Sequence, residues 1–469
     1  MAVSGGAPSR ASVPPGLVLS TLAALVIIVV ANNSMGALAQ PDIAASFGVG
    51  PADVGWVVFG YSVTFAVSTA LWGAIGRRFG VGRSLAVGIV IVGVASLAAV
   101  LAPSLLALIG ARVAQGFGSG AIPTLGNALI GHNFSGPRRT VALGVLVGSV
   151  GVGLAVGPLL GGVLLDLFGW HAVVGAALLT LPTAALVLRA DRDPGDAAAG
   201  IDLRGAVLVG GAALAAVLLL NRLPVSGLTP ITVGALALLA VALPAAGWHS
   251  LARGGSFLPR SVITNRTYVR LVVIGAIGMS TFLGTLVIVP TTLERVQGLS
   301  GLAVGLLLLP MALTSAILSP NNGRVTRRLG SARTARLSLA MLASTPLTLA
   351  IIGPGAAPLA LAVALVPLGA GFALLNAPLI DELMATFEGS LAPVAVGSYN
   401  LVFFLGGALG AALSTALLQA RIALPIVGDG VEPGFTTAAL LLTVMPTTAA
   451  LLVGRGRRRN RPPESAGDD

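Results

Sequence analysis

The chain has 469 residues, of which 55% are hydrophobic and only 9% are charged, and its formal net charge is +11. Soluble domains average about 25% charged residues, so this composition excludes a water-soluble globular protein and indicates a chain that lies in lipid. All 27 basic residues are arginine and there is no cysteine, which excludes a disulfide framework and a nucleotide-binding loop that needs lysine. No nucleic-acid partner is expected, because the arginines stand in short loops between apolar segments.

Apolar stretches follow one another along the chain, each about as long as the ~20 residues that cross a hydrocarbon core. They predict fourteen transmembrane helices after a cytoplasmic tail at 1–15. The predicted spans are 16–39, 52–73, 84–102, 104–131, 140–165, 171–190, 204–222, 230–250, 269–291, 301–320, 334–353, 357–380, 394–419 and 435–454. The first stretch is too long for a signal-peptide core and is interpreted as a retained helix.

The placement of arginine orients these spans. With the N-terminus in the cytoplasm, 23 of the 27 arginines fall in cytoplasmic segments, since 27 minus four leaves 23. The four exceptions are Arg222, Arg295 and Arg421 in outer loops and Arg112 inside a span. This asymmetry follows the positive-inside rule and predicts that both termini are cytoplasmic.

One loop motif occurs twice, 250 positions apart (323 − 73). Its copies are Gly73-Ala-Ile-Gly-Arg77-Arg78-Phe-Gly80-Val-Gly-Arg83 and Gly323-Arg-Val-Thr-Arg327-Arg328-Leu-Gly330-Ser-Ala-Arg333, between the second and third and the tenth and eleventh spans. The repeat predicts a six-helix bundle at 16–190, a linker with two inserted helices at 191–250, a second six-helix bundle at 251–454 and a cytoplasmic tail at 455–469. Duplicated bundles around a central site are a common transporter architecture.

Three further segments carry a family resemblance. The fifth span contains Gly144, Gly153 and Gly157-Pro158-Leu-Leu-Gly161-Gly162, the fourth contains Arg112-Val-Ala-Gln115-Gly116-Phe-Gly118, and the thirteenth contains Gly397-Ser398-Tyr-Asn400 and Gly406-Gly407-Ala-Leu-Gly410. With the loop motif, these segments resemble the major facilitator superfamily, and within it the 14-helix drug:proton antiporter group. The fifth-span glycines match the antiporter motif of exporters. Glycines three and four apart give a flat face for close helix packing, and Pro158 permits a bend.

This resemblance implies an all-α integral membrane protein with the major facilitator fold, made of two six-helix bundles plus two inserted helices. It further implies a transporter and not an enzyme: a secondary active exporter of a hydrophobic drug, antibiotic or natural product, driven by proton antiport through alternating access. The protein is expected in a bacterial inner membrane, as a monomer without cofactor or metal. Two alternatives stay open: a transporter of a physiological metabolite or lipid, and a non-transporting membrane sensor with the same fold.

The loop motif departs from the family pattern at its fifth position. The family usually has an aspartate there, whereas this chain has Arg77 and Arg327. The loop before the thirteenth span is acidic, with Asp381, Glu382 and Glu388, and has no arginine. We therefore expect a charge-reversed cytoplasmic latch in which Arg77 or Arg78 faces Glu388 or its neighbours. The alternative is a solvated loop without specific pairing. The full set of gate candidates is Gly73, Arg77, Arg78, Gly80, Arg83, Gly323, Arg327, Arg328, Gly330, Arg333 and Glu388.

Arg112 is a charge inside the membrane without the carboxylate that the family usually supplies, since Asn32 stands at that position. An arginine at this depth costs at least ~2.5–3.5 kcal/mol on insertion scales, so we expect it to face the substrate cavity with Asn32, Asn33 and Gln115 as hydrogen-bond partners. The alternative is a packing arginine that backbone carbonyls satisfy. Other polar positions that could line the cavity are Tyr61, Asn127, Ser280, Thr281, Ser315, Asn376 and Asn400.

Acidic residues are absent from the middle of every predicted span. Proton antiport needs a group that exchanges a proton, usually a buried carboxylate, and Asp42 and Glu294 near outer helix ends are the remaining candidates. Without a buried anion, dications are poor substrates. Neutral or weakly acidic hydrophobic molecules are expected instead.

Overall fold

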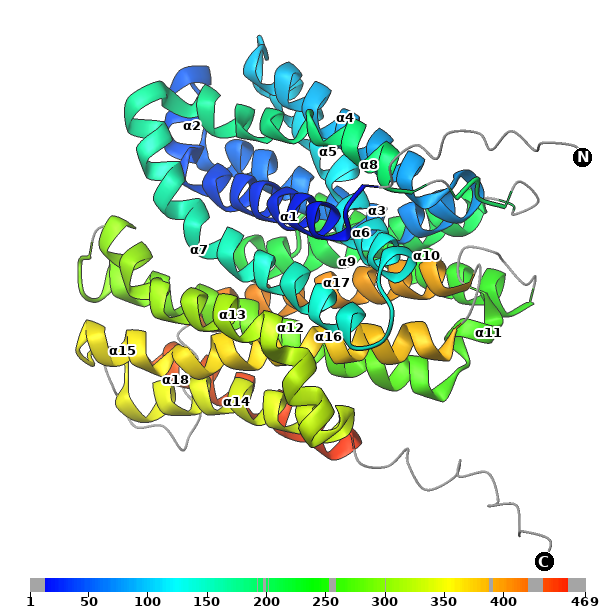
Figure 1. Ribbon diagram of the computed structural model, residues 1–469. Coiled ribbons are helices and arrows are strands. Elements are labelled where there is room, and N and C mark those ends of the chain that lie inside the picture. The colour runs from blue at the N-terminus through cyan, green and yellow to red at the C-terminus, as the bar shows by residue number, and fades with distance from the viewer. Residues whose placement is uncertain are drawn as a thin grey trace, which may run out of the picture.

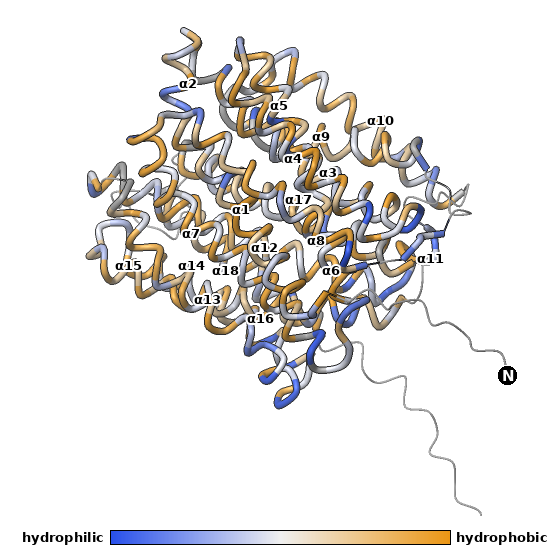
Figure 2. Tube along the Cα trace, turned by 45° about the horizontal axis from the view of Figure 1, so that its top comes forward, coloured by the Kyte–Doolittle hydropathy of each residue, from blue (hydrophilic) through white to orange (hydrophobic). Residues whose placement is uncertain are grey.

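The computed structural model describes residues 13–191, 193–196, 200, 202–252, 259–299, 301–387, 391–420 and 433–453. Within these ranges the secondary structure is helical and no strand occurs. Figure 1 shows long helices packed side by side, with the blue and cyan helices on one side of the molecule and the yellow and red helices on the other. Hydrophobic residues line most of the helix lengths, and hydrophilic residues gather toward helix ends (Figure 2).

The N-terminal part of the chain covers the first six predicted spans. Its helices are α1 (Pro15–Leu38), α2 (Gln40–Phe47), α3 (Pro51–Phe79), α4 (Val81–Val100), α5 (Leu105–Ser119), α6 (Ala121–Asn133), α7 (Gly136–Gly175), the 3-10 helix η1 (Ala176–Thr180) and α8 (Thr183–Ala190). Helix α7 runs through position 158 and leaves helical dihedrals at Gly169, where φ is 72°. A glycine adopts this φ readily, and the chain turns there from the fifth predicted span into the sixth.

The rest of the chain covers the inserted pair and the last six predicted spans. Its helices are α9 (Leu203–Ser226), α10 (Pro230–Ala252), α11 (Arg260–Ile263), α12 (Arg266–Arg295), α13 (Gly301–Leu329), α14 (Ser331–Ile352), α15 (Pro358–Ala364), α16 (Val366–Thr386), α17 (Leu391–Ala420) and α18 (Pro433–Leu452). Side-chain caps start two of them: Asp202 accepts from the Gly205 amide of α9, and Asn265 accepts from the amides of Thr267 and Tyr268 in α12. Such caps satisfy amides that have no partner within the helix.

The all-helical membrane fold predicted from the sequence is confirmed. In the described ranges, 12 helices are long and apolar enough to cross a membrane. The fifth and seventh predicted spans correspond to shorter apolar helices, Val141–Leu154 and Arg204–Leu219. The structure thus has a helix at each predicted span, while the number of fourteen crossings stays a prediction.

Helix contacts repeat between the two parts of the chain. Helix α1 packs along α7, and α12 packs along α17. Contacts between the parts follow the same pattern, because α7 packs on α13 and α17 packs on α3. Suppose that α1, α3 and α7 correspond to α12, α13 and α17. A pseudo-two-fold rotation then exchanges the α7–α13 interface with the α17–α3 interface. This is the relation expected of a duplicated bundle.

The glycines of α7 divide between two neighbours. A methyl group at Gly144 would overlap the Ser319 carbonyl of α13, in the other part of the molecule. A methyl group at Gly157 would overlap Ser34 of α1, within the same part. The glycines therefore allow close approach on both sides of α7, whereas Gly162 has open space beside it. Gly153 and Gly161 also face α1.

Candidate functional site

Arg112 of α5 lies at the centre of a polar cluster inside the N-terminal part and has no exposed surface. Its Nη1 donates to Asn32 Oδ1 at 2.8 Å and to Gln115 Oε1 at 2.9 Å, and its Nε donates to the Val57 carbonyl at 3.2 Å. The guanidinium lies 4.5 Å from the centroid of the Tyr61 ring. Two of the three predicted partners, Asn32 and Gln115, are therefore found, together with a cation–π contact that the sequence did not predict.

The partners of Arg112 are themselves held in place. Asn32 donates to the Val173 carbonyl at 2.8 Å, and Gln115 donates to Ser96 Oγ at 2.7 Å and to the Val174 carbonyl at 3.1 Å. The amide oxygens of both residues thus point at the guanidinium, because their NH₂ groups are engaged elsewhere. The described cluster contains no carboxylate, so amide and carbonyl dipoles and the face of the Tyr61 ring stabilise the buried positive charge.

One donor of the cluster remains without a partner. Arg112 Nη2 is buried and makes no hydrogen bond, and it lies beside Gly36, where an added methyl group would come within 3.0 Å. Asn33 Oδ1 is likewise buried without a partner, so this third predicted neighbour does not satisfy Arg112. A buried unpaired donor costs about 1–3 kcal/mol, and an acceptor brought by a ligand or water would recover that energy.

An aromatic row leads from this cluster into the other part of the molecule. Tyr61 stacks on Phe65 at 6.2 Å between ring centroids, and Phe65 contacts Phe404 of α17 edge-on at 4.7 Å. The row continues through Phe403 to Tyr399, whose hydroxyl donates to Asn376 Oδ1 at 2.5 Å. The aromatic row therefore runs from the predicted residue Tyr61 of α3 to Tyr399 of α17, and a hydrogen bond joins its far end to the predicted residue Asn376 of α16.

Two other predicted cavity residues lie near the same boundary. Asn400 of α17 donates to Thr124 Oγ1 of α6 at 3.2 Å, which is a hydrogen bond between the two parts. Asn127, one turn further along α6, has a buried Oδ1 without a partner. Asn400 accordingly has a packing contact that needs no ligand, whereas Asn127 keeps an acceptor available.

The carboxylates near the outer helix ends lie in exposed positions. Asp42 stands in the short helix α2, and Asp53 and Asp166 are exposed as well. The side chain of Glu294 lies outside the described residues. None of these three described carboxylates approaches the Arg112 cluster as a hydrogen-bond partner.

The first loop motif is covered by the segment that follows α8. Asp191 Oδ2 accepts from the Gly82 amide at 3.0 Å and lies 3.5 Å from His132 Nδ1, while Arg77 Nη2 donates to the Gly200 carbonyl at 3.2 Å. Burial raises the pKa of Asp191, but its hydrogen bonds and His132 outweigh burial and hold that pKa below the usual value. The expected partner Glu388 lies outside the described residues, so its pairing with Arg77 or Arg78 stays a prediction.

An ion pair that the sequence did not predict joins the two parts at their predicted cytoplasmic ends. Arg139 Nη2 of α7 lies 2.6 Å from Asp381 Oδ1 of α16. Asp381 belongs to the acidic loop noted in the sequence, and Arg139 is one of the 23 arginines assigned there to cytoplasmic segments. Their opposite charges were the available signal, but only the packing of α7 on α16 selects this pair from the other combinations.

Comparison with known proteins identifies the family. The sequence model of the Major Facilitator Superfamily matches residues 21–411. The chain belongs to the major facilitator superfamily. This major facilitator is 28% identical over 445 residues to the Tetracenomycin C resistance and export protein of Streptomyces glaucescens, covering 93% of this chain and 81% of that protein.

Other relatives of this major facilitator carry similar names. The Drug efflux pump JefA of Mycobacterium tuberculosis is 29% identical over 441 residues, covering 90% of this chain and 85% of the pump. The Lincomycin resistance protein of Streptomyces lincolnensis is 32% identical over 328 residues, covering 68% and 67%. The crystal structure of the human organic anion transporter MFSD10 (TETRAN) matches 94% of this chain and all of that chain with a TM-score of 0.64. At 14% identity, that likeness concerns the fold alone.

Proposed function

We propose that this major facilitator is a secondary active exporter of a hydrophobic drug, antibiotic or natural product. The observation that carries the proposal is its similarity, over 93% of its length, to a protein named for antibiotic resistance and export. Similarity to a drug efflux pump over 90% of the chain supports the same class of activity. We place the protein in the cell membrane of a bacterium, with both termini in the cytoplasm.

The substrate would bind along the aromatic row between Tyr61 and Tyr399. Aromatic rings offer stacking surface to a hydrophobic cargo. Arg112 Nη2 and Asn127 Oδ1 offer a donor and an acceptor that have no partner among the described residues. No carboxylate contacts Arg112 within the described cluster, so a cation would find no counter-ion there. Neutral or weakly acidic molecules suit this chemistry.

Transport would proceed by alternating access between two bundles, at 16–190 and 251–454, with the inserted pair at 191–250. Contacts such as Gly144 with Ser319, Arg139 with Asp381 and Gly397 with Thr69 lie toward the predicted cytoplasmic ends of their helices. These contacts support an outward-facing arrangement. The small residues at α7 let the two bundles approach closely at that end and separate again.

Proton antiport is proposed on the family resemblance alone. Asp42 is exposed in α2 and is not among the hydrogen-bond partners of Arg112. Asp42 and Glu294 therefore stay candidates for proton coupling. Direct measurement of proton movement separates coupling from export itself.

The test is transport by purified protein in liposomes that contain a pH-sensitive dye. A panel of neutral, weakly acidic and cationic antibiotics is added under a proton gradient, and both drug movement and internal pH are recorded. We expect neutral or weakly acidic compounds to move with a pH change, and Arg112→Gln to reduce their transport about fivefold to thirtyfold, because it removes a donor worth about 1–2 kcal/mol.

Arg336→Gln is the matched control, since Arg336 is exposed on α14. It should transport like the unaltered protein, and size-exclusion chromatography should show that both variants are folded. Movement of drug without a pH change would contradict proton antiport and leave export standing. Failure of every compound to move would contradict export.

A further inference from the structure

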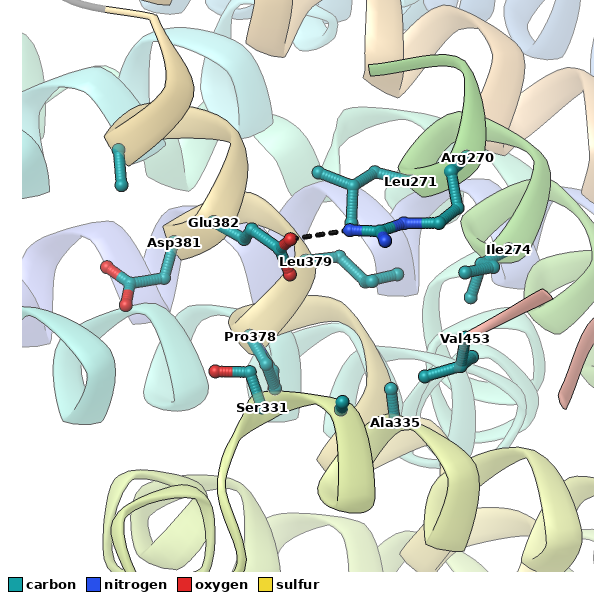
Figure 3. A pocket seen from close by; sticks show the side chains of 12 residues that line it. Arg270, Leu271, Ile274, Ser331, Ala335, Pro378, Leu379, Asp381, Glu382 and Val453 are labelled. Carbon is teal, nitrogen blue, oxygen red and sulfur yellow. Dashed lines mark hydrogen bonds and ion pairs between the residues drawn. The ribbon is translucent and has the colours of Figure 1, made fainter. Parts of the chain in front are cut away.

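A pocket of about 300 Å³ lies at the cytoplasmic end of the second bundle (Figure 3). It opens among the start of α12, the N-terminus of α14, the end of α16 and the residue that follows α18. Its lining consists of Arg270, Leu271, Ile274, Ser331, Ala332, Ala335, Pro378, Leu379, Asp381, Glu382, Ala385 and Val453. Pockets for drug-sized ligands range from about 300 to 1,000 Å³, so this pocket lies at the lower limit of that range. A few side chains would fill it.

Two carboxylates stand at this pocket, and each keeps unused capacity. Glu382 Oε1 accepts from Arg270 at 2.7 Å, and Asp381 Oδ1 accepts from Arg139. Glu382 and Asp381 are 37% and 33% exposed, and these contacts engage only one oxygen of each. A carboxylate accepts about four hydrogen bonds, so both groups can bind further arginine donors.

The first bundle shows what occupies the corresponding place there. Subtracting the repeat offset of 250 relates Ala332 to Gly82, and the N-terminus of α14 to that of α4. In the first bundle the chain that leaves α8 folds back over this point, and Asp191 accepts from the Gly82 amide beside His132. An acidic segment leaving the last helix of the bundle therefore meets a basic residue at the end of α6.

The second bundle has the same arrangement with opposite charges. The acids are now at the end of α16, as Asp381 and Glu382, and the chain that leaves α18 at Val453 is basic. It continues for 16 residues (469 − 453) that lie outside the described part, and these include Arg455, Arg457, Arg458, Arg459 and Arg461. Val453 itself lines the pocket, and in the sequence the arginine-rich segment starts two residues after it, at Arg455.

We propose that this pocket is the docking site of the C-terminal segment 455–461 of the same chain, whose arginines bind Asp381 and Glu382. The segment is tethered at the pocket, its charge is complementary, and the duplicated half binds its own exiting segment at the corresponding place. Since Asp381 also pairs with Arg139 of α7, docking of the tail and closure of the two bundles share one carboxylate.

The chain has no cysteine, so disulfide cross-linking needs no background substitutions. Ala385→Cys places a thiol at the pocket, and Asn460→Cys places one in the tail, seven residues beyond Val453. Seven residues span at most about 25 Å, which also reaches surface outside the pocket. Ser135→Cys with Asn460→Cys is the matched pair, because Ser135 is exposed at the start of α7 but does not line the pocket.

In phosphatidylcholine nanodiscs we expect the Ala385–Asn460 pair to cross-link at least about fivefold more than the Ser135–Asn460 pair. Changing the five tail arginines to glutamine preserves the tether but removes the charge, and should lower the Ala385 cross-link about fivefold or more. The double change Asp381→Asn with Glu382→Gln should do the same.

Anionic lipid is the alternative binding partner of the arginine-rich tail. We expect the cross-link to persist when the nanodiscs also contain phosphatidylglycerol. Its loss there would show that the tail binds the membrane surface instead, and would overturn the proposal. A cross-link that the five glutamines leave unchanged would also overturn it, since tethering alone would then explain the contact.

Discussion

The two copies of the loop motif make the same turn but have different surroundings. Gly80 and Gly330 both adopt positive φ, 89° and 79°, between paired helices. The first copy lies under the segment that carries Asp191 and Asp193, whereas the second borders a pocket. A duplicated motif thus sets the local turn. The segment that leaves the last helix of the first part covers its copy of the turn, and the second copy borders a pocket instead.

The largest expected effect comes from filling the first turn. Gly80→Ala should destabilise the protein by more than the ~1–3 kcal/mol that such backbone strain costs, because its methyl group would also overlap the Asp193 carbonyl. Gly330→Ala introduces the same kind of backbone strain at the second turn, where φ is 79°. Thermal unfolding in detergent compares the two, with Gly110→Ala as control, since nothing lies within 4 Å of Gly110. If Gly80→Ala and Gly330→Ala lower the unfolding temperature equally, the segment that covers Gly80 adds nothing to the cost of the substitution.

A smaller effect is expected from the carboxylate that holds this segment. Asp191→Asn should cost about 1–3 kcal/mol of stability at pH 7 through its bonds to Gly82 and His132. The pKa of Asp191 is lowered in the folded protein, so its contribution is complete above the unfolded value of about 3.9 and disappears as the pH falls through the lower folded value. Unfolding temperatures of both proteins should therefore converge below about pH 4.

Asp193→Asn is the control for that experiment. Asp193 is exposed, and among the described residues its side chain accepts from the nearby Gly195 amide at 2.9 Å, so we expect a smaller loss of stability from its substitution. A difference between Asp191→Asn and the unaltered protein that stays constant from pH 7 to pH 3 would show that the charge of Asp191 does not hold the segment.

The smallest effect is expected at the ion pair that joins the bundles. Arg139 and Asp381 are each about one-third exposed, and such pairs contribute about 0–1 kcal/mol, up to roughly fivefold in an equilibrium. Asp381→Arg should shift the protein away from the cytoplasmically closed state, and adding Arg139→Asp should restore it. Cysteine labelling from the cytoplasmic side, at a position on α13 facing α7, measures the shift.

Arg270 and Glu382 provide the comparison, because they lie within the second bundle and make the same type of contact at 2.7 Å. Exchanging these two charges should not change access from the cytoplasm. If Arg139→Asp together with Asp381→Arg does not recover the closed state, this ion pair does not stabilise closure of the two bundles.

Part of the candidate site could be predicted because its residues lie at similar depths in the membrane. Arg112 and Asn32 stand at similar distances from the ends of their helices, and Gln115 follows Arg112 by about one turn. A buried arginine requires acceptors, so these contacts followed from spacing and energetics. The contact of Tyr61 with Arg112 could not be predicted, since it depends on the rotation of α3 about its axis. The same holds for the aromatic row from Phe65 to Phe404.

Hydropathy, repeat spacing and arginine placement are signals that can be read along one dimension. The helical membrane class therefore followed from the sequence, and the duplication and the orientation could be predicted from it. It also singled out Gly144 and Gly157 as packing positions. The folded arrangement was needed to show that Gly144 faces α13 and Gly157 faces α1, that Asp191 contacts the first loop motif, and that Arg139 pairs with Asp381. These choices depend on which helices become neighbours, and many pairings of small or charged residues satisfy the same local pattern.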